Sequence, residues 1–132
     1  MRLTTFFFYG TLRPGQTNHF VYLHDTPGVV HLGPGLTVGR FTMLASGYPF
    51  VLPAPPVDRI CGDVFRIESA GVVASLDRLE GHTGRRRGYR REILPVETDS
   101  GDLLDCWVYL YHGTPLAEPV PGGDWLFPGR RG

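Results

Sequence analysis

The sequence predicts a small α+β barrel of five or six strands with one or two helices. Apolar blocks rich in β-branched and aromatic residues recur along the chain, and the 18 glycines and 12 prolines fall between them as turns. Only residues 69–81 have a convincing helical pattern. The 132 residues match the usual size of one domain, expected to span residues 1–132. These features together favour a compact, turn-rich barrel.

The first expected strand covers residues 3–9 and ends at Gly10. It is apolar on both faces from Phe6 onward, which is typical of a strand covered on both sides. A short helix is expected over residues 19–24, with Thr17 and Asn18 as candidate N-caps.

Two more strands are expected over residues 34–44 and 59–67, where β-branched and apolar residues return. Three glycines mark turns or bulges around the first of them: Gly33, Gly39 and Gly47.

The helix expected after these strands has the sequence AGVVASLDRLEG, with Ser69 as N-cap and Gly81 at its C-terminal end. At about 100° per residue, the core stripe consists of Val72, Leu76 and Leu79. Asp77 and Arg78 are expected to point further out.

The last two strands, residues 90–98 and 103–112, are expected to form a hairpin around residues 99–101. In the second of these strands, apolar side chains share one face and aromatic side chains the other, which indicates cover on both faces. In the glycine- and proline-rich tail, residues 125–127 are expected to contact the body of the protein.

Composition excludes several function classes. Thirteen basic residues balance thirteen acidic ones, which argues against nucleic-acid and membrane partners. All thirteen basic residues are arginines, which excludes lysine chemistry. No apolar run reaches a membrane span and no leader is evident, so a cytoplasmic location is expected. The oligomeric state has no signature in the sequence.

Metal and cofactor motifs are missing as well. Cys61 and Cys106 lack zinc spacing and are expected to be buried thiols, and the five histidines show no ligand spacing. Of these histidines, only His82 lies near a candidate catalytic residue. No dinucleotide, P-loop, HExxH or GxSxG motif is present. Neither a metal nor a cofactor is therefore expected.

Glu80 is the most informative carboxylate, because it lies beside Val73 at the edge of the helix stripe, within about 80° of its centre. Burial there and the negative end of the helix dipole raise a carboxyl pKa toward the range of a general acid/base. Alternatively, Glu80 reaches outward and pairs with one of the arginines of the segment that follows: Arg85, Arg86, Arg87, Arg90 or Arg91.

A second candidate is the turn Tyr9, Gly10, Thr11 and Leu12, where a buried strand runs toward a helix. Such a turn presents backbone N–H groups that hold a carboxylate or an oxyanion. It can equally be an ordinary connection.

Several segments together resemble the gamma-glutamylcyclotransferase-like superfamily, and in particular its gamma-glutamylamine cyclotransferase-like branch. They are FFFYGTLRPGQTN, SGYPFVLP, GDVFRI, SLDRLEG, GYRRE and CWVYLY, in the order and spacing of that superfamily. The resemblance covers nearly the whole chain. It implies a small mixed β-barrel with flanking helices, a cavity capped by the first strand-to-helix loop, and no cofactor.

The resemblance also assigns roles to residues. Glu80 would be the catalytic acid/base, Tyr9, Gly10, Thr11 and Leu12 the loop that holds the γ-glutamyl group, and Tyr48 and Tyr89 cavity-lining residues. A small γ-glutamyl substrate would lose its amine by intramolecular attack of the α-amine, which releases 5-oxoproline. The leaving group would be selected by the segments 25–35, 53–58 and 113–132.

Two other interpretations remain open from the sequence. In the first, the same cavity binds an amine or amino acid without turnover, as a binding module. In the second, the arginines of residues 85–91 bind RNA, against the zero net charge and the absence of an RNA-binding motif.

Overall fold

The computed structural model describes residues 3–80, 88–113 and 115–127. In chain order the elements are β1 (Thr5–Phe8), α1 (Thr17–Tyr22), β2 (Val29–Ala45), β3 (Pro49–Leu52), β4 (Asp58–Ile67), α2 (Ala70–Glu80), β5 (Gly88–Thr98), β6 (Leu103–His112), β7 (Glu118–Pro119) and a 3-10 turn, η1 (Pro121–Gly123).

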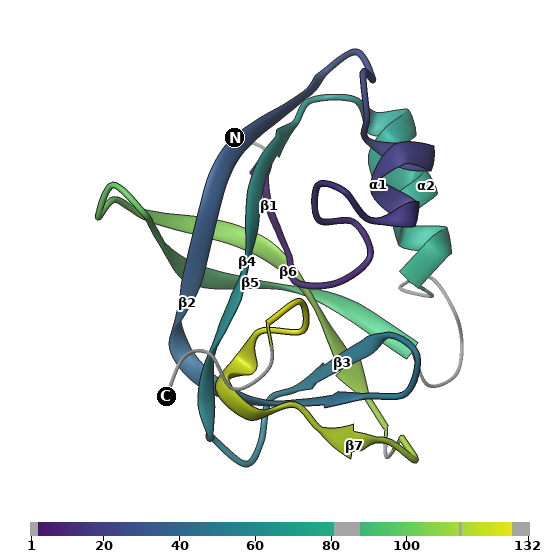
Figure 1. Cartoon of the computed structure of the whole chain (residues 1–132). Coiled ribbons are helices and arrows are strands. Elements are labelled where there is room, and N and C mark those ends of the chain that lie inside the picture. Colours follow the sequence, from purple (N-terminus) through teal and green to yellow (C-terminus); the bar gives the residue numbers. More distant parts are fainter. Residues whose placement is uncertain (1–2, 81–87, 114, 128–132) are drawn as a thin grey trace.

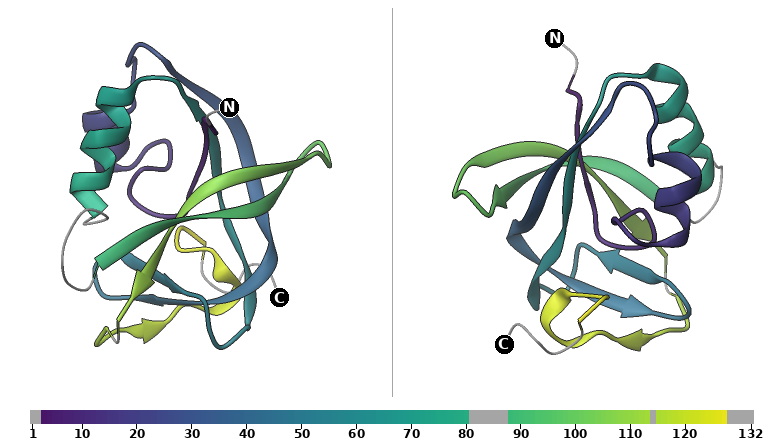
Figure 2. Two further views of the ribbon diagram at one scale, coloured as in Figure 1. Left: turned by 180° about the vertical axis from the view of Figure 1, so that it is seen from behind. Right: turned by 45° about the horizontal axis from the view of Figure 1, so that its top comes forward.

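Five strands close into a barrel in the order β2-β4-β1-β6-β5, and β5 returns to β2. The β1–β6 pair is parallel and the other pairs are antiparallel, so the barrel is mixed. β3 and β7 pair with the end of the long strand β2. The helices α1 and α2 lie side by side on one flank of the barrel (Figures 1 and 2). The predicted mixed barrel with flanking helices is thereby confirmed.

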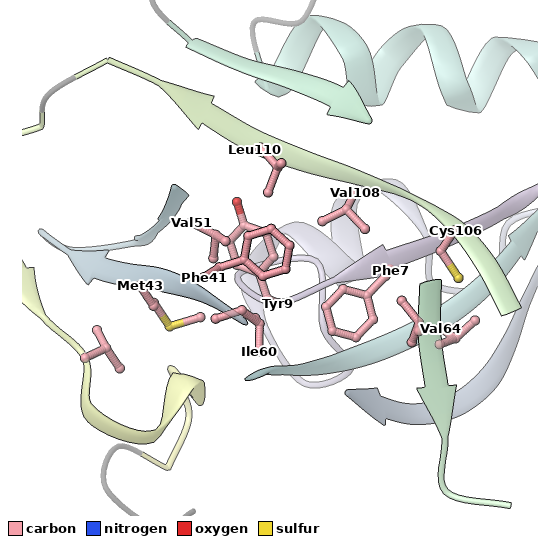
Figure 3. Close-up of a cluster of buried hydrophobic side chains, with 12 residues drawn as sticks. Phe7, Tyr9, Phe41, Met43, Val51, Ile60, Val64, Cys106, Val108 and Leu110 are labelled. Carbon is pink, nitrogen blue, oxygen red and sulfur yellow. The ribbon is translucent and has the colours of Figure 1, made fainter. Parts of the chain in front are cut away.

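The strand β1 separates two apolar clusters by simple alternation. Phe7 and Tyr9 point into the barrel interior, whereas Phe6 and Phe8 pack in the layer that includes Leu76 of α2. Figure 3 shows the interior cluster, to which all five barrel strands and β3 contribute. All three phenylalanines of β1 are at most 3% exposed. The expectation of a strand covered on both faces is confirmed, and the loop after β1 starts from a rigid point.

The start of α1 differs from the expectation. The helix runs over Thr17–Tyr22 and its N-cap is Gln16, which makes no side-chain cap hydrogen bond. Thr17 and Asn18 are therefore inside the helix. The Asn18 side chain instead donates from Nδ2 to Thr11 Oγ1 at 2.7 Å, because a tertiary partner in the preceding loop competes with local capping.

The N-terminus of α2 agrees with the sequence, because the Ser69 Oγ accepts from the Val72 N–H at 3.2 Å. The buried face of α2 differs in part from the expectation. Asp77 is 7% exposed, whereas Leu79, expected in the core, is 37% exposed. Val72 and Leu76 pack in the core layer as expected, Val73 joins them, and Asp77 is buried in place of Leu79. Gly81 lies outside the described residues.

The remaining strands follow the sequence, except that the expectation includes neither β3 nor the two-residue strand β7. The β5–β6 hairpin turns at residues 99–101, where Gly101 has φ +90°. Gly33 lies at a register shift between β2 and β4, as a bulge requires. Strand β3 was not expected, since four residues between Gly47 and a proline cluster carry too weak a pattern.

Close backbone approach explains one glycine in β4. A Cβ on Gly62 would lie 2.3 Å from the carbonyl oxygen of Phe8, so only glycine allows β4 and β1 to pack here.

Across the described part of the chain, no helix has the length and apolar character needed to cross a membrane.

Candidate active site

A cavity of about 710 Å³ opens between the β1–α1 loop, β3, the end of α2, and strands β5 and β6. All seven residues expected at a site line it, although they come from four separate segments: Tyr9, Gly10, Thr11, Leu12, Tyr48, Glu80 and Tyr89. The barrel closure brings these segments to one end of the molecule.

Glu80 is the last residue of α2 and is partly buried at the cavity wall. Burial raises the pKa of its carboxyl from 4.5 to about 7. Within the described residues, no ion pair or hydrogen bond engages this carboxylate. Arg91, one of its candidate partners, pairs with Asp77 instead; Arg85 to Arg87 and His82 lie outside the described residues.

Asp77, one turn before Glu80, fixes the end of α2 against the barrel. Its two carboxylate oxygens accept from the Arg91 Nε at 2.7 Å and the Arg91 Nη2 at 3.1 Å. The Tyr109 hydroxyl donates to Oδ1 at 2.6 Å. The Arg91 guanidinium also lies 4.5 Å from the Trp107 ring centroid. These contacts compensate the buried charge and hold the helix that carries Glu80.

The β1–α1 loop (residues 9–16) is folded by its own backbone. The Arg13 N–H donates to the Gly10 carbonyl at 3.0 Å, and the His19 N–H donates to the Thr11 carbonyl at 3.0 Å. Within the described residues, the N–H groups of Thr11 and Leu12 donate to no protein acceptor. A Cβ on Gly10 would lie 2.8 Å from Pro49 Cγ, which accounts for a glycine where the loop meets β3.

Arg13 anchors this loop to two distant parts of the chain. Its Nε lies 2.8 Å from Asp63 Oδ2 on β4, and its Nη1 lies 3.1 Å from Asp124 Oδ1 near the C-terminus. His31 Nε2 contacts the other Asp63 oxygen at 2.9 Å. Asp124 also accepts the backbone N–H of Leu126. Asp124 thus holds the tail together with Trp125, which packs against the interior cluster as expected, whereas Phe127, also expected to contact the body, is 49% exposed.

Tyrosines fix the opposite wall of the cavity. The Tyr9 hydroxyl donates to the Tyr109 carbonyl and the Tyr89 hydroxyl to the Pro49 carbonyl, both at 2.6 Å. Burial, followed by the neighbouring charges, raises the pKa of Tyr9 and of Tyr89 well above their usual values. Both therefore stay neutral donors. Tyr48 is 52% exposed and contacts Phe50 at the opening.

Several lining residues were not anticipated from the sequence. Asn18, Phe50, Arg78, Tyr111 and Leu116 reach the cavity from elements whose pairing the sequence does not encode locally. Of the segments expected to select a leaving group, the described part of 113–132 contributes Pro115 and Leu116. Segments 25–35 and 53–58 contribute nothing to the lining. Residues 29–35 pair with β4 instead, and the connection before β4 contacts β2 through the Val57 N–H and the Phe41 carbonyl.

Both cysteines are buried as expected, and burial raises the pKa of the Cys106 thiol to about 11. The residues that the structure describes contain no group of three or more histidine, cysteine or acidic side chains placed to hold a metal ion.

Comparison with known proteins places the chain in a family. The family model "Gamma-glutamyl cyclotransferase, AIG2-like" matches residues 6–127. A protein of Methanocaldococcus jannaschii with the name "Putative gamma-glutamylcyclotransferase" is 31% identical over 105 residues, which cover 80% of this chain and 82% of that protein. A gamma-glutamylaminecyclotransferase of Mus musculus is 30% identical over 133 residues, covering 92% and 82% of the two chains.

A solved structure agrees with this assignment. The crystal structure of an AIG2-like protein from Mus musculus superposes with a TM-score of 0.73 at 27% identity, covering 97% of this chain and 85% of that chain. The extent of the family match and the shared barrel lead to one conclusion: the chain belongs to the AIG2-like gamma-glutamyl cyclotransferase family.

Proposed function

We propose that this protein is a gamma-glutamyl cyclotransferase that releases 5-oxoproline and a free amine from a small γ-glutamyl substrate, with Glu80 as general acid/base. The observation that carries the proposal is the Glu80 carboxyl, which lines the cavity with a pKa raised by burial to about 7. A group with that pKa is matched to proton transfer near neutral pH. The names of the relatives support the same reaction class.

In the proposed reaction, Glu80 accepts a proton from the α-ammonium group of the substrate. The freed amine attacks the γ-carbonyl carbon, a five-membered ring closes, and the C–N bond to the leaving group breaks. Glu80 then gives this proton to the departing nitrogen, takes the second proton that the ring nitrogen loses, and passes it to the released amine. Of the three ammonium hydrogens, one stays on the ring nitrogen and two end on the released amine, so atoms and charge balance.

The β1–α1 loop and the tyrosines of the cavity wall would bind the substrate and stabilise the developing charge. The open N–H groups of Thr11 and Leu12 suit an oxyanion or the substrate carboxylate. Tyr9 and Tyr89 are held by backbone carbonyls and shape the cavity for a folded-back substrate. Because the attack is intramolecular, fixing one reactive conformer is a large part of the task.

The test is 5-oxoproline release from a panel of γ-glutamyl dipeptides, γ-glutamylamines, γ-glutamyl-ε-lysine and glutathione. Release by folded protein would support the proposal and name the leaving group. No release from any compound, with saturable ligand binding by calorimetry, would favour the non-catalytic binding module instead.

The pH dependence of this release follows from Glu80. A carboxyl with a pKa of about 7 is protonated below that pH and no longer accepts a proton. We expect kcat/KM to fall about tenfold per pH unit below about 7 and to level off above it. Circular dichroism over the same range controls for unfolding. A flat profile between about pH 5.5 and 8 would contradict the role of Glu80.

A further inference from the structure

Among the described residues that line the cavity, one carries a positive charge that the proposed reaction does not use. Among its described lining residues, the charged side chains are Glu80 and Arg78, both near the end of α2. Glu80 is partly buried, whereas Arg78 is exposed. A substrate whose reacting end meets Glu80 would therefore extend its leaving group toward the exposed end, where Arg78 lies.

The Arg78 guanidinium is free to receive an anion. Its Nη2 donates to the neutral Ser75 Oγ at 3.2 Å. In the described residues, no carboxylate lies within ion-pair distance of it, in contrast to Arg13, Arg59 and Arg91. A guanidinium offers paired N–H donors that match the two oxygens of a carboxylate.

The same cavity carries exposed apolar side chains, which have little reason to face water unless a ligand covers them. Leu116 is 97% exposed, Tyr48 52% and Leu79 37%, and all three line the cavity. Phe50 and Tyr111, whose ring centroids lie 4.8 Å apart, continue this apolar wall. An apolar or aromatic group of the substrate would be stabilised by burial there.

We infer that Arg78 is a specificity-determining residue, which selects leaving groups that are α-amino acids with an apolar or aromatic side chain. Its guanidinium binds the carboxylate of that amino acid, while the apolar wall contacts the side chain. A γ-glutamylamine lacks this carboxylate and gains only the apolar contact. The inference rests on the proposed function, since it concerns the leaving group of that reaction.

The test compares two substrates that differ only in the carboxylate: γ-glutamyl-phenylalanine and γ-glutamyl-phenethylamine. In Arg78→Gln, we expect kcat/KM for the dipeptide to fall about tenfold, mostly through KM, because the contact exists before and during the reaction. The value for the amine should change less than about twofold, since no charge contact is lost. Raising salt from about 0.05 to 0.5 M should weaken the wild-type preference for the dipeptide and leave the variant unaffected.

Arg66→Gln is the matched control, because it removes one exposed arginine on β4 that does not line the cavity. It should leave both substrates unchanged. An equal loss on both substrates in Arg78→Gln would overturn the inference and assign Arg78 to the γ-glutamyl carboxylate; no loss on either would overturn it too. In both cases the proposed function stands. If wild-type protein released 5-oxoproline from neither substrate nor any other panel compound, the proposed function would fail and this inference with it.

Discussion

Replacing Glu80 by glutamine is expected to slow 5-oxoproline release by about 10³-fold without unfolding the protein. Glutamine has nearly the same shape and fills the same position at the end of α2. Its amide accepts no proton at neutral pH, so the step that frees the attacking amine loses its base. Single-turnover release, measured by chromatography at pH 8, gives the rate.

The same variant should be more stable than the wild type at pH 8. Burial raises the Glu80 pKa from 4.5 to about 7, so the folded state binds this proton more tightly than the unfolded state. Wild-type stability therefore falls as pH rises from 4.5 to about 7, and the cost, on the order of 1 to 3 kcal/mol, is fully present above that range. Glutamine has no such charge, and its melting temperature should not follow this dependence.

Glu68→Gln provides the comparison, since the Glu68 side chain is 62% exposed and precedes α2. It should alter neither activity nor the pH dependence of melting. If the activity of Glu80→Gln were within a few-fold of the wild-type activity, the acid/base role of Glu80 would be contradicted. A large loss accompanied by a lower melting temperature at pH 8 would point to damage of the fold rather than of the chemistry.

The strands could be predicted from the sequence because the patterns that define them are local. Alternation in Phe6, Phe7 and Phe8 decides which face each side chain takes, whatever the partner strand is. The β5–β6 hairpin likewise needed only its turn residues and two alternating runs. Several short strands that are covered on both faces are compatible with few folds, of which a closed barrel is one.

The burial of charged side chains could not be predicted from local patterns, because their partners lie far away in the chain. Helical periodicity places Asp77 on the outward side of α2, yet it is buried because Arg91 and Tyr109, 14 and 32 residues further on, satisfy its carboxylate. Arg13 reaches partners 50 and 111 residues away. Arg78 and the aromatic residues Phe50 and Tyr111 belong to the cavity only once the barrel has closed.

Arg13 is the second position where a substitution is expected to have a large effect, here on the free energy of unfolding, because its guanidinium contacts two distant segments. Its removal leaves Asp63 and Asp124 without their shared cation, although their side chains are only 11% and 8% exposed. Arg13→Met should therefore lower the free energy of unfolding by about 3 to 5 kcal/mol, because uncompensated buried carboxylates are costly. Urea denaturation of the wild type and the variant under the same conditions measures this difference.

A second variant separates charge from packing. In Arg13→Met combined with Asp63→Asn and Asp124→Asn, none of these three positions carries a charge, so most of the lost stability should return. Activity should not return with it, because the guanidinium also ties the β1–α1 loop to β4 and to the tail, and Gly10, Thr11 and Leu12 line the cavity from that loop. A triple variant that is both stable and fully active would show that Arg13 compensates charge without positioning the loop. If the variant is stable and slow, the loop geometry that the proposed reaction needs depends on this one arginine.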